Sequence, residues 1–167
     1  RRYPMTQLHG MIGMVPQGSR LAVAELADVA GLWPVPDSTS DKYSRGVLGV
    51  DTGSPRYPGA GLLSTIGALY AGAGFIRFCG PDEVRQLLAQ RAPSVTFGEG
   101  KVQAWLVGCG WGASEDDAVR LARRAGDNVP VVVDAEAVEL GRDHPGVLPA
   151  GSLLTPHAGW SQATPSA

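Results

Sequence analysis

Short apolar runs alternate with longer segments of helical periodicity from position 46 to position 154. The apolar runs predict strands at 46–50, 74–78, 104–107, 131–133 and 153–154. Three consecutive valines at 131–133 are typical of a strand that is covered on both faces. Because strands that alternate with helices pair in parallel, the pattern predicts an α/β fold with three layers, in which helices flank a mostly parallel sheet.

Three of the intervening helices carry apolar residues at helical spacing. We expect these side chains to face the sheet: Leu62, Leu63, Ile66 and Leu69 in the first helix, Val84, Leu87 and Leu88 in the second, and Ala118, Val119, Ala122 and Ala125 in the third. Gly67 and Ala68 are expected to let the first helix approach the sheet closely. Ser114 and Asp117 form a variant capping box ahead of the third helix.

The chain before this pattern has no clear periodicity, so residues 1–40 stay unassigned and residues 41–167 form the expected domain. Prolines at 34 and 36 hold the backbone extended, as in a linker. At 167 residues and 44% hydrophobic content, the chain can build one main domain. The net charge of −2 and the scattered basic residues argue against nucleic acid and anionic membranes as partners.

One uncharged stretch of membrane-spanning length lies between Arg56 and Arg77. It holds five glycines and divides into a loop, a helix and the start of a strand, so a core passage explains it better. The chain opens at Arg1 without a visible secretory signal, and we expect a soluble protein whose true start lies upstream. Cys79 and Cys109 have no metal-ligand spacing, so they are interpreted as buried small hydrophobes and no metal site is predicted.

Small residues follow several of the predicted strands directly: the loop at 51–60, the glycine loop at 108–112, Asp134, and the segment 155–159. In a parallel sheet these segments gather at the carboxyl edge, where α/β proteins bind ligands. Gly59, Ala60 and Gly61 leave the first amides of a helix open to an anionic or polar group. An ordinary strand-to-helix turn remains the alternative for this loop.

A Rossmann-type interpretation competes at the glycine loop. Positions 108–113 fit the pattern G-x-G-x-x-A after a strand, and Asp134 follows at the end of the next strand. Three acids, at 115–117, stand in the first turn of the helix that would receive a pyrophosphate. Their charge has the wrong sign for that ligand.

Six motifs together resemble a known family: Lys42-Tyr43-Ser44-Arg45-Gly46, Gly53-Ser54 with Tyr57-Pro58-Gly59-Ala60, Ala71-Gly72-Ala73-Gly74, Gly108-Cys109-Gly110-Trp111-Gly112, Val133-Asp134-Ala135 and Thr155-Pro156-His157-Ala158-Gly159. Over 41–159 the chain resembles the NAD(P)HX dehydratase domain of the ribokinase-like superfamily. The resemblance implies that Ala60, Gly110, Gly112 and His157 bind the substrate. Asp134 either orients the substrate or caps the next helix. Cys109, Trp111 and Trp160 replace the family's usual Pro, Leu and Glu.

The implied activity is nicotinamide-nucleotide repair, the ADP-dependent (or ATP-dependent) dehydration of (6S)-NADHX and (6S)-NADPHX to NADH and NADPH, with Mg²⁺. The resemblance also implies a cytoplasmic enzyme that forms a homo-oligomer at full length. The family's phosphate-binding Asn-x-Gly-x-Gly-Asp segment does not occur in this sequence, so no catalytic residue is named. We therefore expect a truncated, inactive N-terminal portion of the domain, preceded by the tail of an epimerase domain.

Two further interpretations stay open. The chain could be a non-catalytic dinucleotide-binding or structural remnant, or a ribokinase-like vitamin kinase. The segment Tyr57-Pro58-Gly59-Ala60 favours the dehydratase over the kinase.

Overall fold

The computed structural model describes residues 35, 37–41 and 44–157. The chain divides into two compact units, and the larger one, Pro36–Thr155, contains the helices and strands of the described part. Pro156 and His157 belong to the other unit. The expected linker and the unassigned segment before it lie almost wholly outside the described residues.

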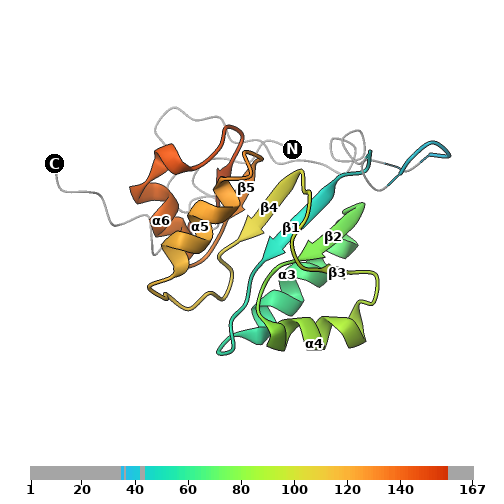
Figure 1. The fold of residues 1–167 in the computed structure, drawn as a ribbon, viewed down its shortest axis with the longest axis horizontal. Coiled ribbons are helices and arrows are strands. Elements are labelled where there is room, and N and C mark those ends of the chain that lie inside the picture. Colours follow the sequence, from blue (N-terminus) through green and yellow to red (C-terminus); the bar gives the residue numbers. More distant parts are fainter. Residues whose placement is uncertain (1–34, 36, 42–43, 158–167) are drawn as a thin grey trace, which may run out of the picture. The chain divides into compact units, whose positions relative to one another are not determined.

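The larger unit is a parallel sheet with helices between its strands (Figure 1). Its elements are β1 (Val47–Asp51), α3 (Pro58–Tyr70), β2 (Phe75–Phe78), α4 (Asp82–Arg91), β3 (Thr96–Phe97), β4 (Ala104–Val107), α5 (Asp117–Ala125), β5 (Val131–Val133), α6 (Ala137–Asp143), a 3₁₀ turn η1 (Pro145–Val147) and β6 (Leu153–Leu154). Within the described residues the strand order is β3-β2-β1-β4-β5-β6, and every pair is parallel. The predicted α/β fold is confirmed.

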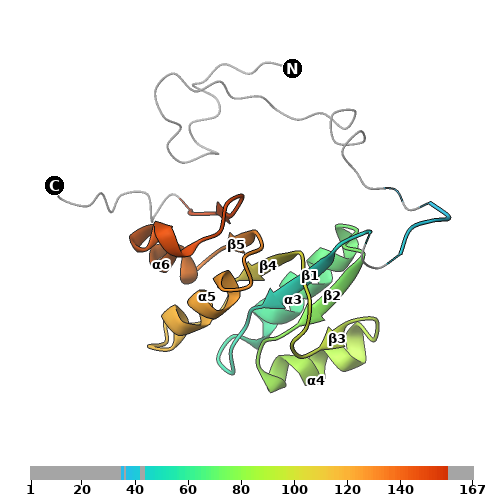
Figure 2. The ribbon, with the colours of Figure 1, turned by 45° about the horizontal axis from the view of Figure 1, so that its top comes forward.

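Two hydrophobic clusters lie on opposite faces of this sheet, whose strands and helices Figure 2 shows from a second direction. On one face Val50, Ile76 and Phe78 pack with Val84 and Leu88 of α4 and with partly buried residues of α3. On the other face the strands meet α5 and α6 through a larger set: Val47, Trp105, Val107, Leu121, Val131, Val133 and Ala137. Burying each large apolar side chain stabilises the fold by roughly 1.5–3 kcal/mol. The sheet is therefore a covered middle layer.

The expected inner face of α3 is wrong in one part. Leu63 is 73% exposed, and nothing lies within 4 Å of a Cβ built on Gly67. The buried residues are instead Gly61 and Thr65, and the Thr65 hydroxyl donates a 2.8 Å hydrogen bond to the Gly61 carbonyl. A Cβ on Gly61 would lie 2.7 Å from a Val84 methyl and 3.0 Å from the Thr52 carbonyl, so the close packing of α3 occurs at Gly61, against α4 and the loop after β1, and not at Gly67. In α4, Val84 and Leu88 are buried as expected, whereas the expectation for Leu87 is wrong, because Leu87 is 40% exposed.

The expected inner face of α5 is largely wrong. Val119 is 69% exposed and Ala118 and Ala122 are exposed, whereas Ala125 is buried as expected. The other residues that α5 buries are Asp117, Leu121 and Arg124. Charged side chains can turn inward here because a buried carboxylate ends β1 beneath the helix. One of the two hydrogen bonds of the expected capping box is present: the Ser114 amide donates to the Asp117 carboxylate at 2.8 Å.

No helix in the described part of the chain combines the length and the apolar character needed to cross a membrane.

Candidate functional site

The strand order reverses between β1 and β4, and the loops that follow these two strands meet at their carboxyl ends. The Gly53 amide donates a 2.7 Å hydrogen bond to the Cys109 carbonyl. A Cβ on Gly110 would overlap the methyl group of Ala60, and a Cβ on Gly112 would lie 3.5 Å from the Tyr57 ring. The structure thus brings Ala60, Gly110 and Gly112 together at the position where doubly wound sheets bind ligands. Their role in substrate binding stays a prediction.

The first turn of α3 opens toward this crevice. Its N-cap residue, Tyr57, makes no side-chain capping bond, and Pro58 occupies the first turn. Gly59 is exposed, and nothing lies within 4 Å of a Cβ built on it. The expectation of three open amides is wrong in two positions, because the Ala60 amide donates to the Tyr57 carbonyl at 3.2 Å and Gly61 is buried. Gly59 is the position at which this helix start can receive a polar or anionic group.

Asp134 connects the loops that follow β4, β5 and β6. Its carboxylate accepts hydrogen bonds from the Cys109 thiol at 3.2 Å and from the Thr155 hydroxyl at 2.6 Å. The main-chain oxygen of Asp134, and not its carboxylate, accepts from the Ala137 amide at the start of α6. The N-cap of α6 is Glu136, without a side-chain capping bond. The carboxylate of Asp134 is therefore directed to neighbouring loops.

His157 is exposed and belongs to the smaller unit, so its proximity to Ala60 stays a prediction. His144 is also exposed.

The two cysteines are half-buried thiols with hydrogen-bond partners. Burial raises the pKa of Cys109 to about 11, and the bond to Asp134 adds to this shift. Burial also raises the pKa of Cys79 to about 11, and its thiol donates to the Gly98 carbonyl at 3.2 Å. Because the thiolate is the reactive form, neither side chain is a nucleophile near neutral pH.

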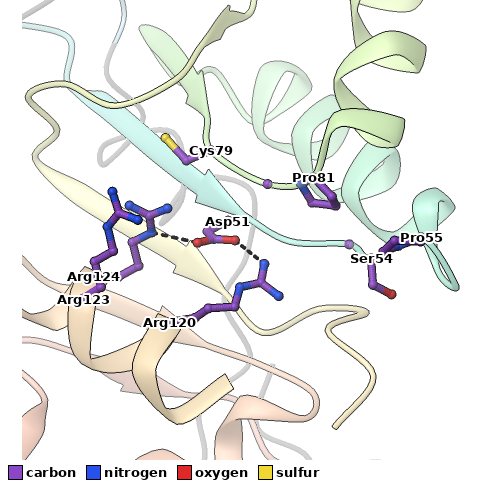
Figure 3. A pocket seen from close by; sticks show the side chains of 10 residues that line it. Asp51, Ser54, Pro55, Cys79, Pro81, Arg120, Arg123 and Arg124 are labelled. Carbon is purple, nitrogen blue, oxygen red and sulfur yellow. Dashed lines mark hydrogen bonds and ion pairs between the residues drawn. The ribbon is translucent and has the colours of Figure 1, made fainter. Parts of the chain in front are cut away.

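A buried charge cluster that we did not predict lies beside the crevice (Figure 3). The Asp51 carboxylate, 3% exposed, receives hydrogen bonds from the Arg120 guanidinium and from Arg124 Nε, the latter at 2.7 Å. Arg124 also donates to both carboxylate oxygens of Glu99 at 3.0 Å. Burial alone would lower the pKa of Arg124, but the charge of Asp51 and these hydrogen bonds raise it above its ordinary value. The guanidinium of Arg124 therefore keeps its charge in spite of its burial.

Two tryptophans extend this network. The guanidinium of Arg120 lies 4.2 Å from the ring centroid of Trp111, and that of Arg124 lies 4.4 Å from the ring centroid of Trp105. Such cation–π pairs add roughly 0.5–2 kcal/mol each, depending on burial. The Trp111 indole donates to the Asp51 carbonyl at 2.8 Å, and the Trp105 indole donates to Asp127 at 2.8 Å.

A cavity of about 330 Å³ borders the cluster. Its walls are formed by α5, by the loop after β1 and by the loop after β2, through Asp51, Gly53, Ser54, Pro55, Cys79, Gly80, Pro81, Arg120, Arg123 and Arg124. Three arginines face one carboxylate on these walls. Glu99 pairs with Arg123 and Arg124, and Asp117 lies 3.6 Å from Arg120, so the surroundings are close to neutral.

The Rossmann interpretation loses support at the start of α5. The Ser114 amide is already paired with the Asp117 carboxylate, which is buried. A pyrophosphate at this helix start would have to displace a carboxylate of the chain itself.

Among the residues that the structure describes, no three His, Cys, Asp or Glu side chains group as metal ligands.

Comparison with known proteins gives a consistent result. A sequence model of the family described as NAD(P)H-hydrate dehydratase matches residues 48–161. The bifunctional NAD(P)H-hydrate repair enzyme of Mycobacterium tuberculosis is 40% identical over 144 residues, which cover 81% of this chain and 30% of that enzyme. The corresponding enzyme of Mycobacterium leprae is 35% identical over 156 residues, 88% of this chain and 32% of that enzyme. The chain thus spans about a third of the length of these relatives.

Two solved structures share the fold. The ADP/ATP-dependent NAD(P)H-hydrate dehydratase of Bacillus subtilis, co-crystallised with ATP and Mg²⁺, superposes with a TM-score of 0.62 and 25% identity over 67% of this chain and 45% of that chain. A ribokinase-like superfamily protein of Enterococcus faecalis superposes with a TM-score of 0.66 and 21% identity over 74% of this chain and 49% of that chain. The second likeness concerns the fold alone.

Proposed function

Because this chain belongs to the NAD(P)H-hydrate dehydratase family, we propose that it acts in nicotinamide-nucleotide repair, the dehydration of (6S)-NADHX and (6S)-NADPHX to NADH and NADPH. The observation that carries the proposal is the contact between Ala60 and Gly110 at the carboxyl ends of β1 and β4. These residues come from the two loops that flank the point where the strand order reverses, which is the general ligand position of such sheets.

We assign the residues of this crevice to substrate binding. Gly110 and Gly112, with φ of +70° and +92°, let the glycine loop pack directly against Ala60 and Tyr57, which forms one wall of the crevice from backbone groups that a ligand can contact. Asp134 is held by Cys109 and Thr155 and can accept a hydrogen bond from a ligand hydroxyl. His157 completes the proposed set. None of these residues is proposed as the base that the dehydration requires.

We further propose that the reaction uses ADP or ATP with Mg²⁺, as supported by the ATP and Mg²⁺ in the Bacillus subtilis structure. The nucleotide would supply the phosphoryl group that turns the added hydroxyl into a leaving group. The described residues do not form a ligand set for the metal, and the near-neutral arginine cluster does not fit a triphosphate. We therefore assign the chain's described groups to the dinucleotide substrate.

Isothermal titration calorimetry of the purified chain with (6S)-NADPHX tests the assignment. We expect binding, and we expect Gly110→Ala to raise the Kd by about tenfold or more, since its Cβ would overlap Ala60 at the ligand position. Gly98→Ala is the matched control: its φ is also positive, +88°, but nothing lies within 4 Å of its Cβ, so it adds similar backbone strain away from the crevice.

Two outcomes would contradict this function. A folded chain that does not bind (6S)-NADPHX would do so, and so would a Gly110→Ala chain that binds as tightly as the Gly98→Ala control. A parallel assay with ADP and Mg²⁺, monitored by the absorbance of the reduced nicotinamide, separates a catalytic chain from a binding module.

A further inference from the structure

Asp51 contacts both sides of the proposed crevice at once. Its carboxylate accepts hydrogen bonds from Arg120 and Arg124 of α5, and its carbonyl accepts from the Trp111 indole at 2.8 Å. One residue at the end of β1 is thus bonded through its side chain to α5 (Figure 3) and through its carbonyl to the glycine loop between β4 and α5.

The glycine loop carries little side-chain bulk of its own. Gly108, Gly110 and Gly112 all adopt positive φ, a conformation that glycine enters without steric cost. Trp111 is the large side chain between two of these glycines, and it is 3% exposed. Its ring is covered by the Arg120 guanidinium, and Arg120 is in turn fixed by the Asp51 carboxylate. The loop is therefore anchored where Trp111 and Asp51 meet.

This anchor determines the distance across the crevice. Besides the indole bond, the two loops are linked by the hydrogen bond from the Gly53 amide to the Cys109 carbonyl at 2.7 Å. Both links start within three residues of the end of β1 and reach the residues that flank Gly110. A shift of the loop by a fraction of an ångström would separate Gly110 from Ala60, because the two are in van der Waals contact.

We propose that Asp51 is a positioning residue for the substrate crevice, which acts through Trp111 and Arg120 to hold the Gly108–Gly112 loop against Ala60. The identity of the ligand in this inference rests on the proposed function, whereas the positioning of the loop by Asp51 does not depend on it. Asp51 needs no contact with the substrate: its charge fixes Arg120, Arg120 covers Trp111, and Trp111 fixes the loop.

The chain offers a matched pair of tryptophans for the test. Trp111→Phe keeps a ring under Arg120 and removes the indole bond to Asp51. Trp105→Phe keeps a ring under Arg124 of the same helix and removes an equivalent indole bond, to Asp127, away from the glycine loop. Asp51→Asn keeps the carbonyl and the side-chain shape and removes the charge that holds Arg120.

Amide hydrogen exchange of Gly110 and Gly112 is measured in these variants at equal global stability, adjusted with urea. We expect exchange to accelerate about tenfold or more in Trp111→Phe and Asp51→Asn, and to stay at the wild-type rate in Trp105→Phe. The Kd for (6S)-NADPHX is expected to rise in the first two variants and to stay unchanged in the third.

Equal exchange rates in all three variants would overturn the positioning role and leave Asp51 as a contributor to global stability alone. If the unaltered chain does not bind (6S)-NADPHX, the proposed function fails, while the exchange rates still decide whether Asp51 positions the loop.

Discussion

The two faces of the sheet are stabilised by different interactions. On the α3/α4 face, Phe78, Val84 and Leu88 are fully buried among apolar neighbours. On the α5/α6 face, near the carboxyl end of β1, Asp51 and Arg124 are almost as completely buried and lie beside Trp105 and Trp111. Apolar packing tolerates small shifts, whereas a buried ion pair requires defined geometry because its desolvation is offset only by well-formed hydrogen bonds. The charged face is the one that holds Trp111, the large side chain of the glycine loop.

Among the variants that test this difference between the faces, Phe78→Ala is expected to lower the stability of the fold most. Truncation of a fully buried aromatic ring leaves a cavity and lowers the free energy of unfolding by about 3–5 kcal/mol. Urea denaturation measures the change, and Leu63→Ala on the exposed side of α3 is the control, with an expected change within about 0.5 kcal/mol. A comparable loss for Leu63→Ala would show that its side chain is covered in solution.

Arg124→Met tests the charged face and is expected to cost about 3 kcal/mol, because it leaves Asp51 and Glu99 without the guanidinium that joins them. The loss is expected to change little with added salt, since the Asp51–Arg124 pair is buried and weakly screened. A triple variant that combines Arg124→Met with Asp51→Leu and Arg120→Leu removes all three charges of the two ion pairs at Asp51. We expect it to be more stable than Arg124→Met alone. A triple variant less stable than Arg124→Met would show that the ionic network is itself the stabilising feature.

The difference between the faces also explains which parts of the fold could be predicted. The five expected strands are present within two residues of their expected bounds, because apolar runs bounded by glycine and proline have few other solutions. The two-residue strand β3 was missed, since Thr96–Phe97 is too short to produce a pattern. In α4 the apolar stripe was largely right, because the helix packs by hydrophobic burial.

For α5 the same rule failed, because Arg120 and Arg124 face a carboxylate that is 69 and 73 positions away in sequence. Periodicity assigns arginines to solvent and cannot see such a partner. The sequence did contain a signal for this pairing. Asp51 ends an apolar strand, and Arg120 and Arg124, four positions apart, lie in the helix that follows another apolar strand. The contact of Ala60 with Gly110 was foreseeable from strand order, whereas the anchoring of Trp111 was not.

Gly49→Ala and Gly67→Ala test the difference between the two faces with the smallest expected changes in stability. A Cβ on Gly49, in β1, would overlap the Trp105 ring on the charged face, and we expect a loss of about 1–3 kcal/mol from overpacking. Gly67, on the outer side of α3, has nothing within 4 Å of its Cβ position, so alanine there is expected to add about 0.5–1 kcal/mol through helix propensity.

Thermal unfolding of both variants provides the measurement, because their shifts should have opposite signs. A loss for Gly67→Ala would mean that the outer side of α3 is covered in the folded protein. No change for Gly49→Ala would mean that the Trp105 ring moves freely. That result would break the comparison, since the network over β1 depends on Trp105 and Trp111 as fixed surfaces beneath Arg124 and Arg120.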